Sequence, residues 1–386
     1  MRLKTLPIFL AFFLMGLADA MGPNSDKVKD YYHISNVQST LLSFAVFIAF
    51  AVCSVPGGLL AARIGKKKLL LLGLGVNAAA LVIPSVMVPN FWVLLGCIFL
   101  LGAGTTFLQV SGNPIMRDVS AEGKYSRNLA FAQGIKGIGS TASTYLLSAI
   151  SAVFVIRGME DWQAGFPFFC GLMALAFVAV LPLKVEESTV EAPPSIGSSV
   201  GLLTEPIFFL AVLGIFLYVG AEASMGRFLS PVLQDFGFDK KESIKYGPAA
   251  FFLLLTIGRL LGSAILSIMS ARTCFRLSAL LGMLGAAALM TGSKYASFAG
   301  IVAAGLGFAN IWPMLFSITV EERPERASEL SGLMCMAISG GAIVPLVMGW
   351  LIDRGLTQAM AFVIPTICFA YLLAISLRGG RAVAKN

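Results

Sequence analysis

The stretch LLLLGLGVNAAALVIPSVMVPNFWVLLGCIFLLGAGTTFLQV, residues 69–110, contains no Asp, Glu, Lys, Arg or His side chain. It is twice as long as the apolar segment of about 20 residues that an α-helix needs to cross the hydrocarbon core of a bilayer. Pro89 and Asn90 divide it into two nearly equal parts. The stretch therefore predicts two consecutive membrane-spanning helices, at 68–88 and 91–116.

Segments of the same character recur along the whole chain of 386 residues. Apolar residues make up 57% of the sequence and charged residues only 12%, against about 25% charged residues in a soluble domain. This composition excludes a soluble enzyme, a disordered chain and a nucleic-acid-binding protein. It predicts an all-α integral membrane protein with twelve transmembrane helices, at 5–24, 37–62, 68–88, 91–116, 127–154, 163–183, 204–235, 244–269, 273–292, 295–318, 327–351 and 358–378.

The basic residues indicate how the chain is oriented in the membrane. With both termini in the cytoplasm, 17 of the 28 Lys and Arg residues fall on the cytoplasmic side and 8 on the opposite side. Cytoplasmic loops of membrane proteins carry an excess of Lys and Arg. We therefore expect a multi-pass protein whose two termini are cytoplasmic, and the net charge of +8 does not call for a nucleic-acid partner.

One polar stretch divides the predicted spans into two groups of six. It covers residues 184–203, begins with KVEESTVEAPPSIGSS, and has the Pro, Ser and Glu content of a flexible linker. We therefore predict an N-terminal six-helix bundle at 1–183, a cytoplasmic linker at 184–203 and a C-terminal six-helix bundle at 204–386. GAGTTFLQVSGNP in the fourth span and GLGFANIWP in the tenth echo each other weakly, as expected for two parallel repeats.

Residues suited to catalysis or metal binding are scarce. The six cysteines lie in apolar stretches without a CxxC pair, where Cys acts as a small hydrophobic residue, and His33 is the one histidine of the sequence. Neither a nucleophile–base pair nor a metal-ligand cluster is recognisable. We therefore expect no cofactor, no metal site and no enzymatic activity.

Several motifs resemble known transporters. PGGLLAARIGKKK (56–68) resembles the loop between helices 2 and 3 of the major facilitator superfamily, with Ala62 in place of the usual acidic residue. Both halves of the chain resemble the fucose–galactose–glucose:cation symporter family, in FLQVSGNP (107–114), RNLAFAQGIKGIGS (127–140), FLYVGAEASMGRFL (216–229), WPMLFSI (312–318) and MAISGGAIVPLVMGWLID (336–353). The resemblance implies the major facilitator fold with two pseudo-symmetric six-helix bundles. It also implies a monomeric, cation-coupled sugar transporter of a bacterial inner membrane that works by alternating access.

The chain departs from that family at three positions. Gln109 stands at the helix-4 position where fucose-transporting members carry an acid. Glucose- and galactose-transporting members resemble this chain in having Gln at that position. The helix-1 acid of the family aligns near Pro23, whereas Asp19 lies one turn earlier. The helix-5 Asn of the family aligns with Lys136. We therefore expect the polar groups of the cavity to be rearranged.

Five charged side chains inside the predicted spans are candidate functional residues, because a charge in the bilayer core costs several kcal/mol and is rarely kept without a role. They are Asp19, Lys136, Glu222, Arg227 and Arg259. Asp19 and Lys136 can form an ion pair for which a proton or a substrate hydroxyl would compete, and this predicts cation coupling at Asp19. The alternative is a permanent ion pair that fixes helix packing.

Glu222 lies near the middle of the seventh span, one turn after Tyr218 on the same helix face. We expect it to bind sugar hydroxyls or to carry the coupling proton. The alternative is a buried acid paired with Arg227 or Arg259. Arg259 resembles part of a Gly-Arg pair that the family has in helix 8, which favours a structural or gating role for it.

Amide side chains offer both donors and acceptors, which suits sugar hydroxyls. Gln109 and Asn113 share one face of the fourth span, and Trp312 can either stack on a pyranose ring or serve packing alone. The predicted substrate-binding residues are Gln109, Asn113, Gln133, Lys136, Tyr218, Glu222, Asn310 and Trp312.

Charged helix ends on the cytoplasmic side predict the salt bridges of a gate, with solvated helix ends as the alternative. Arg117 and Asp118 end the fourth span, and Glu321–Arg323 end the tenth. In the eleventh span the triplet SGG at 339–341 predicts either a helix break or a tight helix contact. The predicted gating residues are Arg63, Arg117, Asp118, Arg227 and Arg259.

The sequence leaves more than one transport function open. The preferred function is secondary active transport of a monosaccharide or a related polar solute coupled to H⁺. Na⁺ is the alternative cation, because Asp19 and nearby carbonyl oxygens would offer it ligands. An anionic sugar (a uronate, sialate or sugar phosphate) bound by Lys136 and Arg227 is the alternative substrate, since three of the five candidate charged residues are basic and two are acidic. The direction of transport, uptake or export, is also open.

Overall fold

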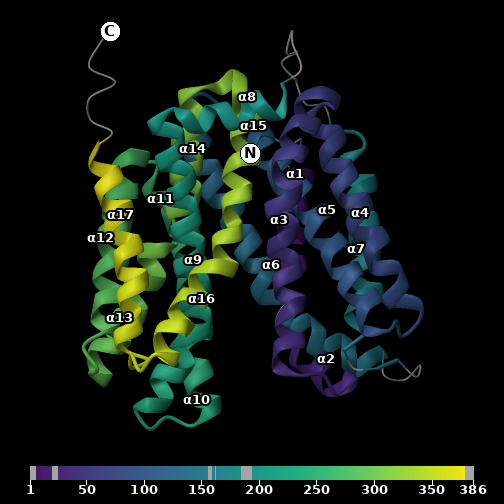
Figure 1. Cartoon of the computed structure of the whole chain (residues 1–386). Helices are drawn as coiled ribbons and strands as arrows, with labels where there is room; N and C mark the ends of the chain where they lie inside the picture. Colours follow the sequence, from purple (N-terminus) through teal and green to yellow (C-terminus); the bar gives the residue numbers. More distant parts are fainter. Residues whose placement is uncertain (1–5, 20–24, 155–158, 161, 184–193, 379–386) are drawn as a thin grey trace. The chain divides into compact units, whose positions relative to one another are not determined.

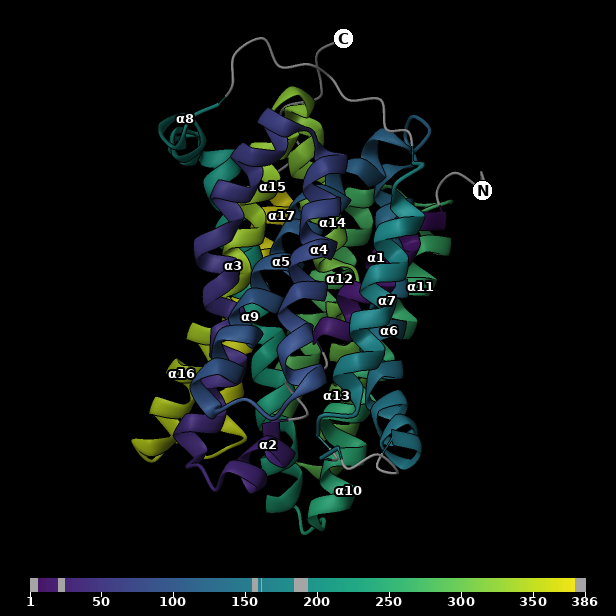
Figure 2. The same ribbon diagram turned by 90° about the vertical axis from the view of Figure 1, so that its right-hand side faces the viewer.

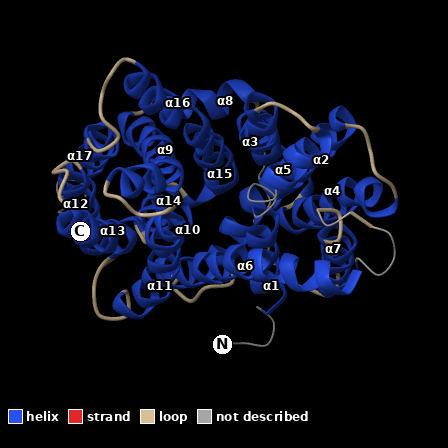
Figure 3. Cartoon of the chain, turned by 90° about the horizontal axis from the view of Figure 1, so that it is seen from below, coloured by secondary structure: helices blue, strands red, loops and turns tan. Residues whose placement is uncertain are grey.

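The computed structural model describes residues 6–19, 25–154, 159–160, 162–183 and 194–378. All regular secondary structure within these ranges is helical (Figure 3). Long uncharged segments form helices because a helix pairs its backbone N–H and C=O groups within one segment, and the bilayer core offers them no water. The predicted all-α class is confirmed.

Long helices alternate with short helical segments along the described chain. The long helices are α1 (Leu6–Asp19), α3 (Asn36–Ile64), α4 (Lys66–Val86), α5 (Phe91–Asp118), α6 (Tyr125–Phe154), α7 (Gly165–Val180), α9 (Pro206–Asp235), α11 (Ala250–Ile265), α12 (Ala271–Leu289), α13 (Lys294–Phe308), α14 (Ile311–Glu322), α15 (Ala327–Met336), α16 (Gly340–Asp353) and α17 (Val363–Arg378). The short segments are α2 (Ser25–Tyr32), α8 (Ile196–Gly201), η3 (Leu202–Thr204), α10 (Lys240–Ile244), the π-helical turn η4 (Lys245–Ala249), η5 (Pro324–Arg326), η6 (Ala337–Ser339) and η7 (Met360–Phe362).

Each predicted span coincides with one helix or with consecutive helices. Among the described residues, nine helical stretches are long and apolar enough to cross a membrane. The shorter apolar helices Leu6–Gly16 and Gly165–Val180 lie in the first and sixth predicted spans. Helix α6 covers the fifth. The helices are therefore consistent with the twelve predicted spans of a multi-pass membrane protein.

Two compact units can be separated in the described chain, and Figure 1 shows their helices in sequence colours. Unit 1 comprises Met1–Ala121, Ile135–Val200 and Glu325–Met336, and unit 2 comprises Glu122–Gly134, Gly201–Pro324 and Ala337–Asn386. Each unit thus contains residues from both predicted halves, because α6 begins in unit 2 and α15 belongs to unit 1. The predicted domain boundaries at 183 and 204 stay a prediction, and residues 184–193 of the predicted linker lie outside the described residues.

Within unit 1, α5 packs against α1, α3 and α4, and α4 also lies beside α7 (Figure 2). The buried Asn77 of α4 donates from Nδ2 to Oγ1 of Thr105 in α5, with 3.2 Å between the two atoms. Glycines let these two backbones approach closely. A Cβ on Gly104 would lie 2.1 Å from Asn77 Oδ1 and 2.8 Å from the backbone oxygen of Gly73. The α4–α5 contact therefore depends on the absence of a side chain at position 104.

Gly104→Ala is expected to lower the melting temperature, because the new Cβ can be accommodated only by moving α4 away from α5. Overpacking of this kind costs about 1–3 kcal/mol. Gly96→Ala in the same helix is the matched control, since a Cβ there would meet no atom within 4 Å. Thermal unfolding of the purified variants in detergent measures the difference. Equal melting temperatures for the two variants would contradict the close α4–α5 contact.

Within unit 2, α9 packs against α14, α16 and α17 around an aromatic core. Phe308 stacks on Phe369, with 4.0 Å between the ring centroids, and its ring centroid lies 6.1 Å from that of Tyr218. The first turns of α6 also belong to this unit, and the Oγ atoms of Ser126 and Ser317 are hydrogen-bonded at 2.8 Å. Tyr218 is thereby fixed in the core of unit 2, on the face of α9 that carries the predicted site.

Two of the predicted spans are interrupted. The tenth divides into α13 and α14 at residues 309–310, and the eleventh divides into α15, η6 and α16. The second break falls at the SGG triplet, and a Cβ on Gly340 would lie 2.0 Å from the backbone oxygen of Phe216. Both alternatives for the triplet are therefore realised, a helix break and a tight helix contact.

Candidate functional site

A cluster of polar side chains lies inside unit 2, between α9, α11 and the break that separates α13 from α14. Arg259 of α11 is its centre. Its Nη2 lies 3.6 Å from Oε2 of Glu222 and donates to the hydroxyl of Tyr218 at 3.4 Å. Its Nε donates to the backbone oxygen of Ala309 at 3.3 Å. One buried cation thus joins two residues of α9 to the interrupted helix.

The ion pair between Glu222 and Arg259 is loose. Its N–O separation of 3.6 Å exceeds the roughly 2.7–2.9 Å of a good charge-assisted hydrogen bond. The Glu222 side chain is 22% exposed, and that of Arg259 is 11% exposed. The Glu222 carboxylate can therefore accept a hydrogen bond from a ligand hydroxyl, while Tyr218 and Ala309 hold Arg259 in place.

Pro313 explains why Arg259 finds a free carbonyl group. In a continuous helix the N–H of residue 313 would donate to the oxygen of residue 309, but proline has no N–H and its ring clashes with that carbonyl group. The helix breaks at this point, and Asn310 adopts φ −107° and ψ 1° ahead of α14. The carbonyl oxygen of Ala309 accepts its hydrogen bond from Arg259 instead.

Asn310 is fixed next to this contact. Its Nδ2 donates to the backbone oxygen of Gly258 at 2.9 Å, and the side chain packs directly on Gly262, where a Cβ would lie 2.1 Å from Oδ1. Asn310 is 5% exposed, and in the described part of the chain no donor reaches its Oδ1. A buried acceptor is therefore left beside the Arg259 cluster, where a hydroxyl group could donate to it.

Trp312 lies in the first turn of α14 and is largely buried. Its ring stacks on Phe316, with 4.8 Å between the centroids and 19° between the planes. One face of the indole ring is therefore covered by packing. The predicted stacking of Trp312 on a sugar ring stays a prediction.

Arg227 lies apart from the cluster. It is exposed, and its guanidinium carbon lies 5.9 Å from the ring centroid of Phe228. Of the two arginines predicted as partners of Glu222, the structure brings Arg259 to it.

The other predicted amide residues are buried in helices of both units. Gln109 and Asn113 lie four residues apart in α5 of unit 1, and Gln133 lies in the part of α6 that belongs to unit 2. All three side chains are less than 5% exposed. Their role in binding a substrate stays a prediction.

The predicted pair of Asp19 and Lys136 is described in part. Helix α1 passes directly over α6 in unit 1, where a Cβ on Gly16 would lie 2.0 Å from the backbone oxygen of Lys136 and Ser140 Oγ donates to the oxygen of Gly16 at 3.1 Å. Asp19 follows Gly16 within one helical turn, but its side chain lies outside the described residues. The ion pair and the coupling role of Asp19 stay predictions.

The predicted gating residues Arg117 and Asp118 lie at the end of α5. Asp118 Oδ2 is 2.5 Å from Nζ of Lys66, and Asp118 Oδ1 is 3.9 Å from Nη1 of Arg117. Lys66 was not among the predicted residues, although the KKK run at 66–68 marked this turn as basic. Arg63, at the end of α3, is exposed. Asp118 is therefore neutralised mainly by Lys66.

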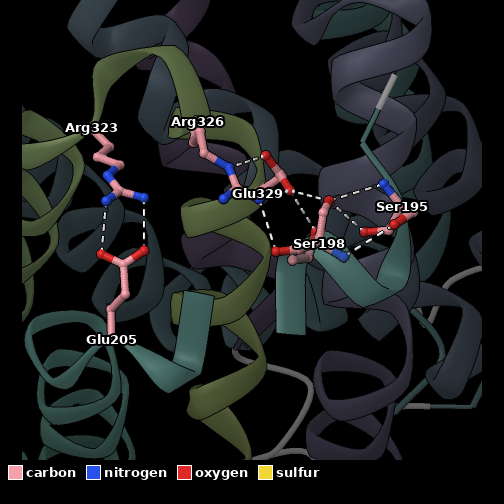
Figure 4. Close-up of polar contacts among 7 residues, drawn as sticks. Ser195, Ser198, Glu205, Arg323, Arg326 and Glu329 are labelled. Carbon is pink, nitrogen blue, oxygen red and sulfur yellow. Dashed lines mark hydrogen bonds and ion pairs between the residues drawn. The ribbon is translucent and has the colours of Figure 1, made fainter. Parts of the chain in front are cut away.

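Two further ion pairs lie near the start of α9 and of α15 (Figure 4). In unit 2, both guanidinium Nη atoms of Arg323 lie 2.8 Å from the two carboxylate oxygens of Glu205. In unit 1, Arg326 binds both oxygens of Glu329. Glu329 is a charged residue inside the predicted span 327–351 that was not predicted as functional, although a charge within a membrane span is the signal that could have identified it.

The sequence model of the Major Facilitator Superfamily matches residues 8–344, which is most of the chain. The protein belongs to the Major Facilitator Superfamily. Its members are membrane transporters and not enzymes, so the expected absence of an enzymatic activity is in keeping with the family.

Individual relatives extend over nearly the whole chain. A glucose/galactose transporter of Brucella abortus biovar 1 (strain 9-941) is 29% identical over 399 residues, which cover 98% of this chain and 93% of the relative. An L-fucose-proton symporter of Escherichia coli (strain K12) is 24% identical over 94% of this chain and 89% of its own length. These relatives agree with the resemblance found in the motifs.

Solved structures show the same fold. A crystal structure of the E. coli fucose:proton symporter superposes with a TM-score of 0.84 at 20% identity and covers 98% of this chain and 99% of the symporter. A second structure, described as the outward conformation of that transporter, gives a TM-score of 0.83 at 19% identity and the same coverage. The predicted major facilitator fold is confirmed.

Proposed function

We propose that this member of the superfamily transports a neutral monosaccharide together with H⁺, and that Glu222 and Arg259 couple the two. The supporting observation is that one buried arginine contacts both the carboxylate of Glu222 and the carbonyl group at a helix break. Interrupted helices form the substrate sites of many secondary transporters, near the middle of the bilayer. The similarity to a glucose/galactose transporter and to an L-fucose-proton symporter agrees with this substrate class.

The charges in unit 2 favour a neutral sugar over a sugar acid. The positive charge of Arg259 faces the negative charge of Glu222, and Arg227 is exposed outside the cluster. A carboxylate substrate would need an uncompensated cation in the site, because a buried charge is costly unless it is paired. Hydroxyl groups can instead use the acceptor of Asn310 and the donors of Arg259.

The coupling follows from competition for Arg259. When Glu222 takes up a proton, it loses the charge that attracts Arg259, and a guanidinium N–H becomes available to a sugar oxygen. Protonation of Glu222 and sugar binding then favour each other, and by thermodynamic linkage each raises the affinity for the other by the same factor. The same proposal includes the predicted Asp19–Lys136 pair as a second titratable element in the N-terminal bundle.

The proposed oligomeric state, membrane and orientation apply to the whole protein. We place it as a monomer in a bacterial inner membrane, with both termini in the cytoplasm and with the bundles at 1–183 and 204–386 alternating between access to the two sides. The excess of basic residues in the loops assigned to the cytoplasm supports this orientation.

Uptake into proteoliposomes tests the proposal. The purified protein is reconstituted, and an inward H⁺ gradient is imposed in the presence of labelled glucose, galactose, fucose or galacturonate. We expect at least one neutral hexose to accumulate against its gradient under the H⁺ gradient, and none to accumulate under a Na⁺ gradient alone. Accumulation of galacturonate only would indicate the anionic substrate class, and a requirement for Na⁺ would contradict coupling to H⁺.

A further inference from the structure

A groove of about 460 Å³, open along one side, lies between α4 and α7 within unit 1. The face of α4 that carries Gly73 and Asn77 packs on α5, and the groove follows another face of the same helix. Its lining residues recur every third or fourth position along α4, with one aromatic ring from α7 beside them. They are Lys68, Leu71, Leu72, Gly75, Val76, Ala79 and Phe177. The groove is therefore apolar except at the end that Lys68 forms.

The missing side chain at position 75 keeps the middle of the groove open. A Cβ on Gly75 would lie 3.9 Å from Cε2 of Phe177, which is an ordinary van der Waals contact. Gly73 differs, because a Cβ there would lie 2.8 Å from the backbone oxygen of Gly104 in α5. Gly73 thus serves helix packing, whereas a large side chain at position 75 would fill the groove without disturbing the contact with α5.

The surroundings of the groove are apolar and exposed. Leu72 of α4 is 41% exposed, and Leu175 and Val178 of α7 are 60% and 61% exposed. Helix α4 is one of the helical stretches that are long and apolar enough to cross a membrane. Apolar side chains exposed on such a helix face lipid tails, which are as apolar as Leu. The groove therefore opens toward acyl chains of the bilayer.

The length of the groove matches one leaflet of the membrane. Lys68 and Ala79 lie eleven residues apart on α4. At a rise of 1.5 Å per residue this separation is about 16 Å, and half of a hydrocarbon core of about 30 Å is about 15 Å. The groove thus reaches from the basic end of α4 to about the middle of the bilayer, which suits a single acyl chain.

The three lysines at the start of α4 have different surroundings. Lys66 is paired with Asp118 at the end of α5, and Lys67 Nζ donates to the backbone oxygen of Leu181, just beyond α7, at 2.7 Å. Lys68 is exposed and lines the groove, and none of the ion pairs among the described residues involves it. The first turn of α4 contains no acidic residue. The end of the groove therefore carries a positive charge that the described side chains do not neutralise.

We propose that this groove binds a phospholipid with an anionic headgroup, whose phosphate contacts Lys68 and one of whose acyl chains lies along α4 beside Phe177. Basic pockets between transmembrane helices bind anionic headgroups. A soluble anion would use the lysine but leave the apolar groove empty. A zwitterionic phospholipid would fill the groove, but the positive charge of its own headgroup would weaken the attraction to Lys68. This site lies beyond the proposed sugar transport and does not depend on it.

Binding of single lipids tests the proposal without any sugar. The full-length protein is purified in detergent and depleted of lipid, and phosphatidylglycerol or phosphatidylcholine with the same acyl chains is added. Native mass spectrometry measures the affinity for the first lipid bound. We expect the wild type to bind phosphatidylglycerol about fivefold more tightly, which is the effect of one lysine beside an anionic membrane surface. Lys68→Gln should remove this preference, and Gly75→Leu should weaken binding of both lipids at least fivefold.

Two control variants carry the same substitutions outside the groove. Lys241→Gln removes an exposed lysine from the first turn of α10 in unit 2. Gly171→Leu adds the larger side chain to α7 at a position where a Cβ would meet no atom within 4 Å. Both controls should change the affinity for phosphatidylglycerol less than twofold. Melting temperatures without lipid show for each variant whether the protein is folded.

Several outcomes would overturn the proposal. Wild-type affinity for phosphatidylglycerol in either Lys68→Gln or Gly75→Leu would do so, because the site needs both the charge and the open groove. A loss in Lys241→Gln equal to that in Lys68→Gln would indicate general attraction between a basic protein and an anionic lipid. Binding of palmitate more tightly than phosphatidylglycerol would identify a fatty acid as the occupant instead.

Discussion

Replacing Arg259 by Ala is expected to lower sugar uptake at least 100-fold. The substitution leaves Glu222 without its counter-charge and the carbonyl oxygen of Ala309 without its donor. Arg259 also donates to the hydroxyl of Tyr218, and loss of each hydrogen bond to its charged group costs about 1.5–3 kcal/mol, where each 1.4 kcal/mol corresponds to a factor of ten. Initial rates of hexose uptake in proteoliposomes, normalised to the amount of protein inserted, measure the loss.

Two further variants separate this effect from a general loss of folding. Arg227→Ala removes an exposed arginine that lies outside the cluster, and its uptake should stay within twofold of the wild type. Arg259→Lys keeps the charge and should fold, yet it should lower uptake about tenfold because a lysine lacks the planar fork that reaches several acceptors at once. Near-normal uptake in both Arg259 variants would show that the cluster does not take part in transport.

Replacing Glu222 by Gln is expected to abolish accumulation of the sugar while exchange of sugar across the membrane continues. Gln fills the same space but carries no titratable proton, so a proton gradient can no longer drive the substrate. The ratio of internal to external sugar should fall to about one, which is the limit set by the sugar gradient alone. Uptake under an imposed pH gradient and counterflow between preloaded vesicles and medium measure the two activities separately.

Asp235→Asn serves as the control for Glu222→Gln, because Asp235 is an exposed acid at the end of the same helix. Accumulation should be unchanged in this variant. If Glu222→Gln still accumulates sugar, the coupling proton is bound elsewhere. The predicted Asp19 is then the residue to test, through Asp19→Asn.

The positions of the spans followed from the sequence because the bilayer imposes a simple rule. A segment of about 20 residues without charge must pair its backbone internally, so each such segment becomes a helix whatever packs around it. For that reason the predictions 68–88 and 91–116 coincide with α4 and α5. A polar residue caps the start of α5, where the side chain of Asn90 accepts a hydrogen bond from the N–H of Val93.

Partner choice within the site could not be predicted, because it depends on rotation and height of neighbouring helices. The sequence offered two arginines, Arg227 and Arg259, as partners of Glu222. Only the packing of α11 against the break after α13 shows that Arg259 is the partner. The motifs GAGTTFLQVSGNP and GLGFANIWP, each with a Gly-x-Gly pair followed by a proline, also form different structures. Helix α5 continues through Pro114, whereas the helix breaks four residues before Pro313, although each proline leaves one carbonyl group to a side chain of another helix.

The short helix α8 could not be predicted from the sequence, because it is stabilised by contacts with a residue far away along the chain. Six residues containing two glycines and two serines form no stable helix alone. The buried carboxylate of Glu329 supplies the partners that order it, and this residue lies about 130 positions away in the chain. Contacts of this kind leave no periodic pattern that the sequence could display.

Sugar-dependent movement of H⁺ tests the central claim most directly. Proteoliposomes in unbuffered medium without Na⁺ receive a neutral hexose, and the external pH is recorded while sugar uptake is followed in parallel. We predict that the medium becomes more alkaline as sugar enters through the wild-type protein, and that Glu222→Gln takes up sugar down its gradient with no change of pH. Sugar uptake by the wild type without any change of pH, or an undiminished change of pH in Glu222→Gln, would contradict proton coupling through Glu222 and Arg259.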